Sequence, residues 1–123
     1  SEATLKKGEI SDAESHGKRA LELSRQFGVK EAEGRTLRIL GMISAEQKDW
    51  SRAEERFEIS ISVLTTAGIR KELALSYLEY GRMLEKKGDR ERAKEKLNET
   101  LRLFGAMKLA HKSEEVQREL GEL

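Results

Sequence analysis

Residues 37–57 read LRILGMISAEQKDWSRAEERF, and residues 77–97 read YLEYGRMLEKKGDRERAKEKL. Gly41, Asp49 and Ala53 of the first stretch return forty residues later in the second. The returning residues are Gly81, Asp89 and Ala93, and the same period also joins Ala13 to Ala53, Gly28 to Gly68, and Gly81 to Gly121. Small residues held at one fixed period indicate that one small unit is stacked repeatedly, each copy covering its neighbour's apolar face.

Each unit is predicted to contain two helices joined by a tight turn. In the unit 29–68, one apolar stripe lies in 35–46 and a second in 50–64. Asp49 between them can cap a new helix, and Gly68 stands where a left-handed residue would end it. The predicted helices are 11–26, 30–47, 50–66, 70–87, 90–105 and 110–121, with no strand, so the expected fold class is all-α.

Glycines inside the first helix of a unit predict a close helix contact. Gly41 and Gly81 fall midway along these helices, where glycine costs about 1 kcal/mol relative to alanine. Because the two glycines stand at equivalent positions of successive units, we expect the second helix of each unit to approach closely there. Ala53 and Ala93 would be the small residues of the second helices at this contact. Gly17 takes the place of a bulky residue in the first copy, so we expect that interface to be poorly packed.

The repeated residues resemble the signature of the tetratricopeptide repeat, a large–x–x–Leu–Gly–x–x–large pattern followed by Ala–x–x–x–Phe. The residues that carry the resemblance are Leu37, Leu40, Gly41, Ser44, Trp50, Ala53 and Phe57, then Tyr77, Tyr80, Gly81, Leu84, Ala93 and Leu97, then Leu120 and Gly121. The resemblance implies a right-handed superhelical solenoid of antiparallel helix pairs with a concave peptide-binding face. The period of forty residues is longer than the common thirty-four, as in a longer variant of the repeat.

The whole chain, 1–123, is expected to form one domain. Its units are 1–28 (partial), 29–68, 69–108 and 109–123 (partial), which predicts a fragment of a longer array. The stretch 101–123 is also similar to the closing repeats of large prokaryotic ATPases, cyclases or transcriptional regulators. The apolar residues Leu5, Ile10 and Leu21 near one end, and Val116 and Leu120 near the other, predict self-association through uncovered ends. The alternative is that residues 109–122, whose outer face is polar, cap the array.

Composition argues against several classes of function. The net charge is +1 and charged residues make up 38% of the chain, which gives no reason to expect nucleic acid or a membrane as partner. The chain has no cysteine and no apolar run of about 20 residues, and we expect a cytoplasmic protein. His16 and His111 lie in polar stretches, and no phosphate-binding glycine motif is present. We therefore expect no enzyme, no cofactor and no metal.

The expected function is protein–protein interaction, with a peptide or partner helix bound on the concave face. The alternative is a sensor or regulatory segment of a larger ATPase, cyclase or transcriptional regulator. The candidate groove residues, expected to be exposed on first helices, are Arg35, Arg38, Met42, Leu78, Glu79, Arg82 and Arg118. Arginine can clamp a carboxylate with two parallel bonds. Arg56 and Arg92, on second helices, are expected to play no part in binding.

Overall fold

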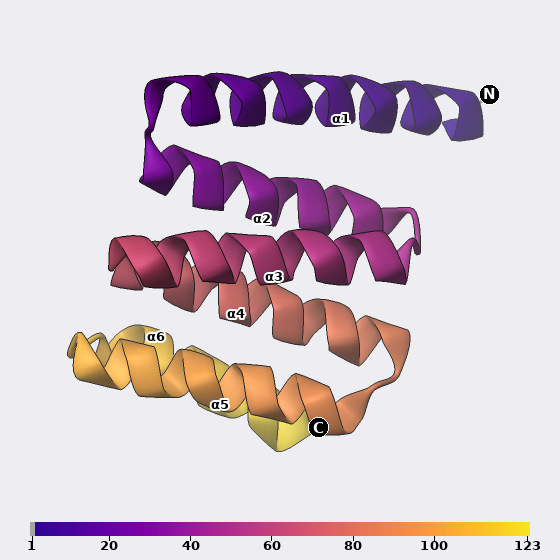
Figure 1. The fold of residues 1–123 in the computed structure, drawn as a ribbon. Coiled ribbons are helices and arrows are strands. Elements are labelled where there is room, and N and C mark those ends of the chain that lie inside the picture. Colours follow the sequence, from indigo (N-terminus) through magenta and orange to yellow (C-terminus); the bar gives the residue numbers. More distant parts are fainter. Residues whose placement is uncertain (1) are drawn as a thin grey trace.

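The computed structural model describes the backbone of residues 2–123 and the side chains of 7–109 and 111–123. Over that part of the chain the fold is all-α, with no strand, as predicted. The helices are α1 (Glu2–Phe27), α2 (Lys30–Glu46), α3 (Trp50–Ala67), α4 (Arg70–Lys87), α5 (Arg90–Ala106) and α6 (Ala110–Glu122). In Figure 1 they run from α1 at the top to α5 at the bottom, with α6 behind α5. Each helix packs against the next along the chain, and α2 also contacts α4.

The forty-residue period sets where the helices begin. Helices α2, α4 and α6 start forty residues apart, as do α3 and α5. The side chains of Asp49 and Asp89 each accept a hydrogen bond of 3.3 Å from the backbone amide three residues on, which caps α3 and α5. Gly68 and Gly88 end α3 and α4 with φ of 71° and 95°, the left-handed conformation that favours glycine. The predicted caps are thus confirmed.

Helix α1 is longer than predicted. The repeat phase placed a helix at 11–26 and treated 1–7 as the end of a different helix, but α1 runs without a break from Glu2 to Phe27. Gly8 lies inside α1, and a side chain at that position would meet no other atom within 4 Å. With no proline and no neighbouring helix at this point to require a turn, the helix formers around Gly8 continue one helix.

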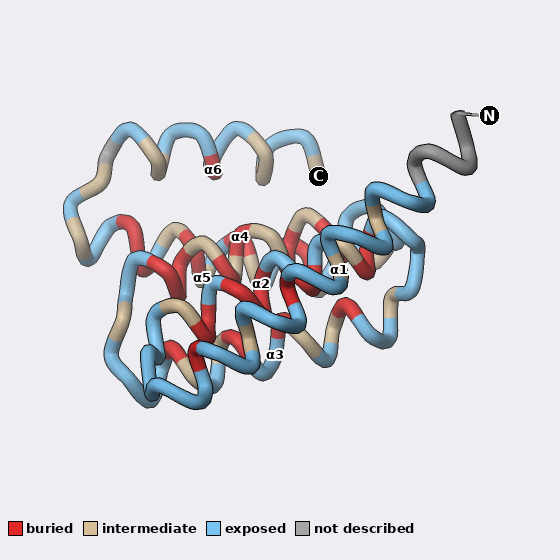
Figure 2. The backbone as a smooth tube through the Cα atoms, turned by 90° about the horizontal axis from the view of Figure 1, so that it is seen from above, coloured by how far each residue is buried: buried red, intermediate tan, exposed pale blue. Residues whose placement is uncertain are grey.

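The core lies where the middle four helices face one another, as the buried positions in Figure 2 show. Ala53 and Ala93 are fully buried, as expected for the small residues of the second helices at this contact. A side chain at Gly41 would come within 3.1 Å of the ring of Phe57, and one at Gly81 within 3.0 Å of Leu97. These glycines therefore make room for the bulky residue of the partner helix, which explains their equivalent positions in successive units.

The expectation of a poorly packed first interface at Gly17 is wrong. Gly17 is buried, and a Cβ atom there would lie 2.5 Å from Cδ2 of Leu40 on α2. One period later, Phe57 occupies the position of Gly17 and faces Tyr80, which occupies the position of Leu40. Gly17 packs against Leu40 in one copy, and the rings of Phe57 and Tyr80 stack in the next. Both interfaces are therefore filled.

The two ends differ in how well they are covered. Val116 was expected to lie open, but it is buried in the core, because α6 packs back on α5, and Leu120 is partly buried. Ile10 and Leu21 on α1 are also partly buried, whereas the Leu5 side chain lies outside the described residues. The uncovered apolar side chains are instead Leu23, Phe27 and Val29, with 71% of Phe27 exposed.

Candidate functional site

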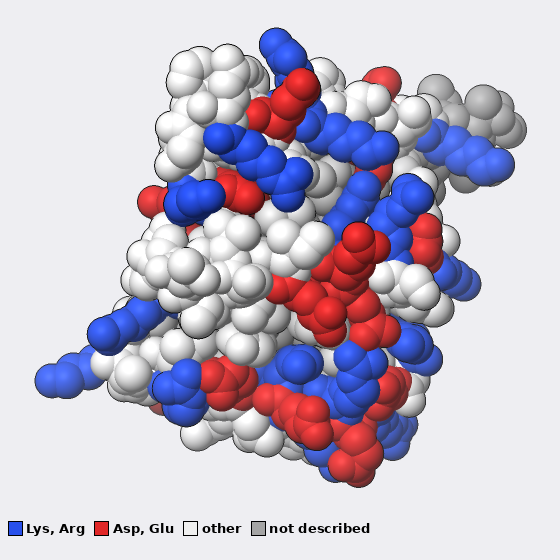
Figure 3. Space-filling model, viewed as in Figure 1, with Lys and Arg blue, Asp and Glu red and all other residues white. Residues whose placement is uncertain are grey.

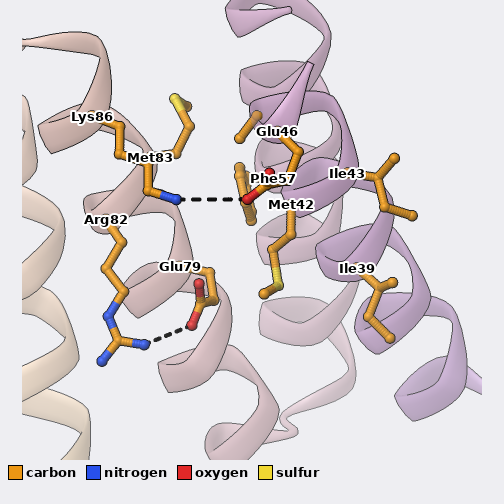
Figure 4. Close-up of a pocket in the computed structure, with 10 residues that line it drawn as sticks. Ile39, Met42, Ile43, Glu46, Phe57, Glu79, Arg82, Met83 and Lys86 are labelled. Carbon is orange, nitrogen blue, oxygen red and sulfur yellow. Dashed lines mark hydrogen bonds and ion pairs between the residues drawn. The ribbon is translucent and has the colours of Figure 1, made fainter. Parts of the chain in front are cut away.

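The clearest candidate for a binding site is a hollow of about 280 Å³ between α2 and α4, shown in Figure 4. Its lining residues are Ile39, Met42, Ile43, Ala45, Glu46, Phe57, Glu79, Arg82, Met83 and Lys86. Ile39 and Met42 remain 46% and 39% exposed, while Phe57 and Met83 are buried beneath them. The hollow thus combines an accessible apolar wall with a packed apolar floor.

Helical periodicity places the apolar wall on one side of α2. Ile39, Met42 and Ile43 follow an i, i+3, i+4 spacing, so they share a face of the helix. The neighbouring face carries Leu37 and Leu40, which are buried in the interior. Helix α2 therefore has two adjacent apolar faces, one that builds the core and one that lines the hollow.

The rim of the hollow consists of paired charges. A guanidinium nitrogen of Arg82 donates a 2.8 Å hydrogen bond to Glu79 on the same helix. The ammonium of Lys86 lies 3.9 Å from a carboxylate oxygen of Glu46 on α2, so this ion pair bridges the two helices across the opening. Each cation of the rim is thus matched by a carboxylate of the same rim.

Arg82 is engaged further by α6. Its Nε and Nη2 atoms donate hydrogen bonds of 3.1 and 2.5 Å to the two carboxylate oxygens of Glu119. The hydrogen bond to Glu119 raises the pKa of Arg82 above its ordinary value. Arg82 therefore joins α4 to α6, and the two carboxylates of Glu79 and Glu119 balance its charge.

Arg38 is not exposed in a groove, contrary to the sequence-based expectation. Only 8% of it is exposed, and its Nη1 donates to the carboxylate of Glu72 at 3.0 Å and to the Glu72 carbonyl at 3.2 Å. The face of α2 that carries Arg38 is covered by α4, so this arginine ties two units together. Arg35, which is exposed, lies 3.7 Å from the other Glu72 carboxylate oxygen.

Leu78 is likewise misplaced by the sequence analysis. It was expected on the exposed groove side, but it is 7% exposed and belongs to the core cluster with Leu73 and Phe104. Arg118 is exposed on α6, as expected, but it does not line the hollow. Of the seven predicted groove residues, the hollow therefore contains Met42, Glu79 and Arg82.

Sequence reasoning missed the other lining residues, which are the apolar Ile39, Ile43, Ala45, Phe57 and Met83 and the charged Glu46 and Lys86. The repeat phase assigned Ile39 and Ile43 to the packing stripe of α2 together with Leu37 and Leu40. A stripe that includes 37, 39, 40 and 43 spans more of the helix than one neighbour can cover. This excess width was the signal in the sequence for a second, accessible apolar face.

The arginines of the second helices are also structural. Arg56 on α3 donates to both carboxylate oxygens of Glu14 on α1, at 2.7 and 3.0 Å, and to Ser44 Oγ at 2.8 Å. Arg92 on α5 bonds Glu54 on α3 at 2.5 Å and the Tyr80 hydroxyl at 2.9 Å. Glu14 and Glu54 hold the same place in successive units, but their arginine partners do not. Both arginines tie neighbouring helices together, so changing either one would also affect the stability of the fold.

Glu54 is the centre of a charged network on this side of the molecule. Besides Arg92, it accepts a 3.0 Å bond from Lys87, and the hydrogen bond from Arg92 lowers its pKa to about 2. Burial raises the pKa of Tyr80, whose hydroxyl lies 3.1 Å from Glu54 and 3.0 Å from Glu58. On the face drawn in Figure 3, acidic and basic side chains adjoin one another mainly along the right-hand side, while much of the left-hand side is uncharged.

The residues considered for chemistry lie apart from the hollow. His16 and His111 are both exposed, on α1 and α6. Among the described side chains, no three of histidine, cysteine, aspartate and glutamate are grouped so that they could hold a metal ion. In the same part of the chain, no helix combines the length and the apolar character needed to cross a membrane.

Comparison with known proteins found no matching family model, no matching curated protein and no matching solved structure.

Proposed function

We propose that this chain is a repeat domain of the tetratricopeptide type, a right-handed superhelical solenoid whose α2–α4 hollow binds a segment of a partner protein. Helix starts that recur every forty residues support the repeat. So do the contacts at Gly41 and Gly81, where the signature glycine receives the bulky residue of the paired helix. The cytoplasmic location expected from the sequence stays a prediction.

The observation that carries the binding function is the exposure of Ile39 and Met42 beside a preformed apolar floor. In the described part of the chain, large apolar side chains are exposed at six positions, and these two line the same hollow. Scattered single apolar residues need no explanation, but accessible ones gathered around a hollow are typical of an interaction site.

The size of the hollow favours a protein segment over a complete small molecule. Its volume of about 280 Å³ lies just below the roughly 300–1,000 Å³ of small-molecule sites. A space of this size accepts one or two apolar side chains. Burying one such side chain fully contributes about 1.5–3 kcal/mol, so an anchor here can dominate a small interface.

The proposal is tested by capturing partners from a lysate with the wild-type chain and with an Ile39→Glu, Met42→Glu double variant. Charges on the wall should remove the specifically captured protein while the melting temperature changes little, since both residues are exposed. Ile59→Glu is the matched control, because Ile59 is exposed on α3 outside the hollow. Capture that survives the double variant, or that is lost equally in the control, would rule out this site.

A further inference from the structure

A second hollow continues the first along α4. It has a volume of about 480 Å³, lies between α4 and α6, and shares Glu79, Arg82 and Lys86 with the α2–α4 hollow. Its other lining residues are Glu85, Glu119 and Glu122. A segment bound over the apolar wall of α2 can therefore extend across α4 onto this neighbouring surface.

The two hollows together carry more acidic than basic side chains. Their carboxylates are Glu46, Glu79, Glu85, Glu119 and Glu122, and their cations are Arg82 and Lys86. Arg82 donates hydrogen bonds to Glu79 and Glu119, and the ammonium of Lys86 lies 3.9 Å from Glu46. Glu85 and Glu122 are exposed and make no ion pair with any described side chain. Arg118, on the turn of α6 before Glu122, lies outside both linings, and counting it still leaves acidic residues in excess.

We propose that the partner of the α2–α4 hollow is a basic amphipathic segment. Its apolar side chain fills the space beside Ile39 and Met42, and its lysines or arginines reach Glu85 and Glu122. This inference rests on the proposed binding function and specifies the chemistry of the partner. The sequence pattern had favoured a carboxylate ligand held by arginines. Arg82, the arginine that lines the two hollows, is paired with Glu79 and Glu119, so the exposed charges without an ion pair in these hollows are those of Glu85 and Glu122.

The preference for a basic partner comes from the charges around the two hollows and not from the net charge of the domain. The chain has a formal net charge of +1, so its overall field does not attract a basic peptide. An acidic segment in the hollow would place its carboxylates beside Glu85 and Glu122, and like-charge contacts at an interface select against a partner. Because these glutamates are exposed, the preference should weaken as salt is added.

Binding in the α2–α4 hollow can be detected from the methyl signals of the chain's methionines. Met42 and Met83 line it, whereas Met107 lies at the end of α5, outside both hollows. The wild-type chain, labelled with ¹³C at the methionine methyl groups, is titrated with two synthetic peptides. Both peptides have the same leucine positions on a helical pattern, and their polar positions are lysine in one and glutamate in the other. The lysine peptide should shift the Met42 and Met83 signals, leave Met107 in place and bind at least tenfold more tightly.

Charge-reversal variants locate the source of this preference. The Glu85→Lys, Glu122→Lys double variant should lose at least tenfold in affinity for the lysine peptide. The matched control is Glu55→Lys, Glu95→Lys, since these glutamates are exposed on α3 and α5 outside both hollows.

Equal losses of affinity in the two double variants would overturn the proposal, because the effect would then come from the overall charge of the chain. Equal or tighter binding of the glutamate peptide at Met42 and Met83 would overturn the basic partner but keep the site. If neither peptide moves these two signals, both the site and its partner are wrong.

Discussion

The ring of Phe57 on α3 stacks on the ring of Tyr80 on α4, with centroids 5.5 Å apart and ring planes inclined by 13°. Both residues are fully buried. The stack joins the second helix of one unit to the first helix of the next, and Phe57 also forms part of the floor of the α2–α4 hollow. The packing between units therefore sets the shape of the candidate site.

Truncation at this stack should weaken the whole fold. Phe57→Ala is expected to lower the free energy of unfolding by about 3–5 kcal/mol, the usual cost of removing a buried phenylalanine. Tyr80→Phe keeps the ring contact and removes only the hydroxyl hydrogen bonds, so it should cost about 1 kcal/mol. Urea unfolding measures both, and comparable losses in the two variants would contradict a stabilising role for the stack.

Reversing the charge of Arg38 should destabilise the protein. In Arg38→Glu, two carboxylates would face each other in a nearly buried site, and breaking a buried pair costs about 3–5 kcal/mol. Arg35→Glu, a reversal at an exposed position near the same Glu72, should cost under about 1 kcal/mol. Chemical denaturation of the two variants gives the comparison. Stability unchanged in Arg38→Glu would place Arg38 on a free surface, as the sequence had suggested.

Glu54 should make the protein sensitive to acid. Its pKa of about 2 in the fold lies below the ordinary value of 4.5, because Arg92 and Lys87 stabilise its ionised form. Ionised Glu54 therefore stabilises the fold fully above about pH 4.5, and this contribution is lost as the pH falls toward 2. The difference in unfolding free energy between wild type and Glu54→Gln should shrink over that range. A difference that stays constant from about pH 7 to about pH 3 would show that Glu54 is not held in this network.

The chain should self-associate through the exposed apolar side chains at the end of α1 and just after it. Phe27, Leu23 and Val29 form an exposed apolar group at that end, whereas Val116 at the other end is buried. Sedimentation velocity should detect dimers or larger species of the wild-type chain that Phe27→Glu converts to monomers. A matched Gln117→Glu change, at an exposed position of α6, should leave the distribution unchanged. A wild-type monomer at every accessible concentration would refute the prediction.

The positions of the helices were predictable from the sequence because residues that begin and end helices recur in each repeat. Asp49 and Asp89 begin helices, Gly68 and Gly88 end them, and apolar stripes fill the intervals. Helices α2 to α6 accordingly match the predicted ranges to within a residue at each end. Helix α1 was predicted too short, because the repeat pattern placed a helix start at 11, whereas α1 continues through Gly8 without a turn.

The site was less predictable, since exposure on a helix depends on which neighbour covers each face. Arg38 and Leu78 occupy the same place in successive units, and that place faces an adjoining helix in both. The charge of Arg38 suggested that its side chain faces solvent. Its guanidinium instead donates a hydrogen bond to Glu72, thirty-four residues further along the chain. Met42 was identified correctly, because it lies one turn further along α2 than Arg38, at the point where the hollow between α2 and α4 leaves it accessible.

The most direct test of the binding site is the affinity of the lysine peptide for Met42→Glu and for Ile59→Glu, measured by isothermal titration calorimetry. If the α2–α4 hollow is the site, Met42→Glu should weaken binding by more than about tenfold, or about 1.4 kcal/mol, and Ile59→Glu should bind like the wild-type chain. Equal affinity of Met42→Glu and wild type would contradict the account, because a buried apolar anchor cannot tolerate a carboxylate in its pocket.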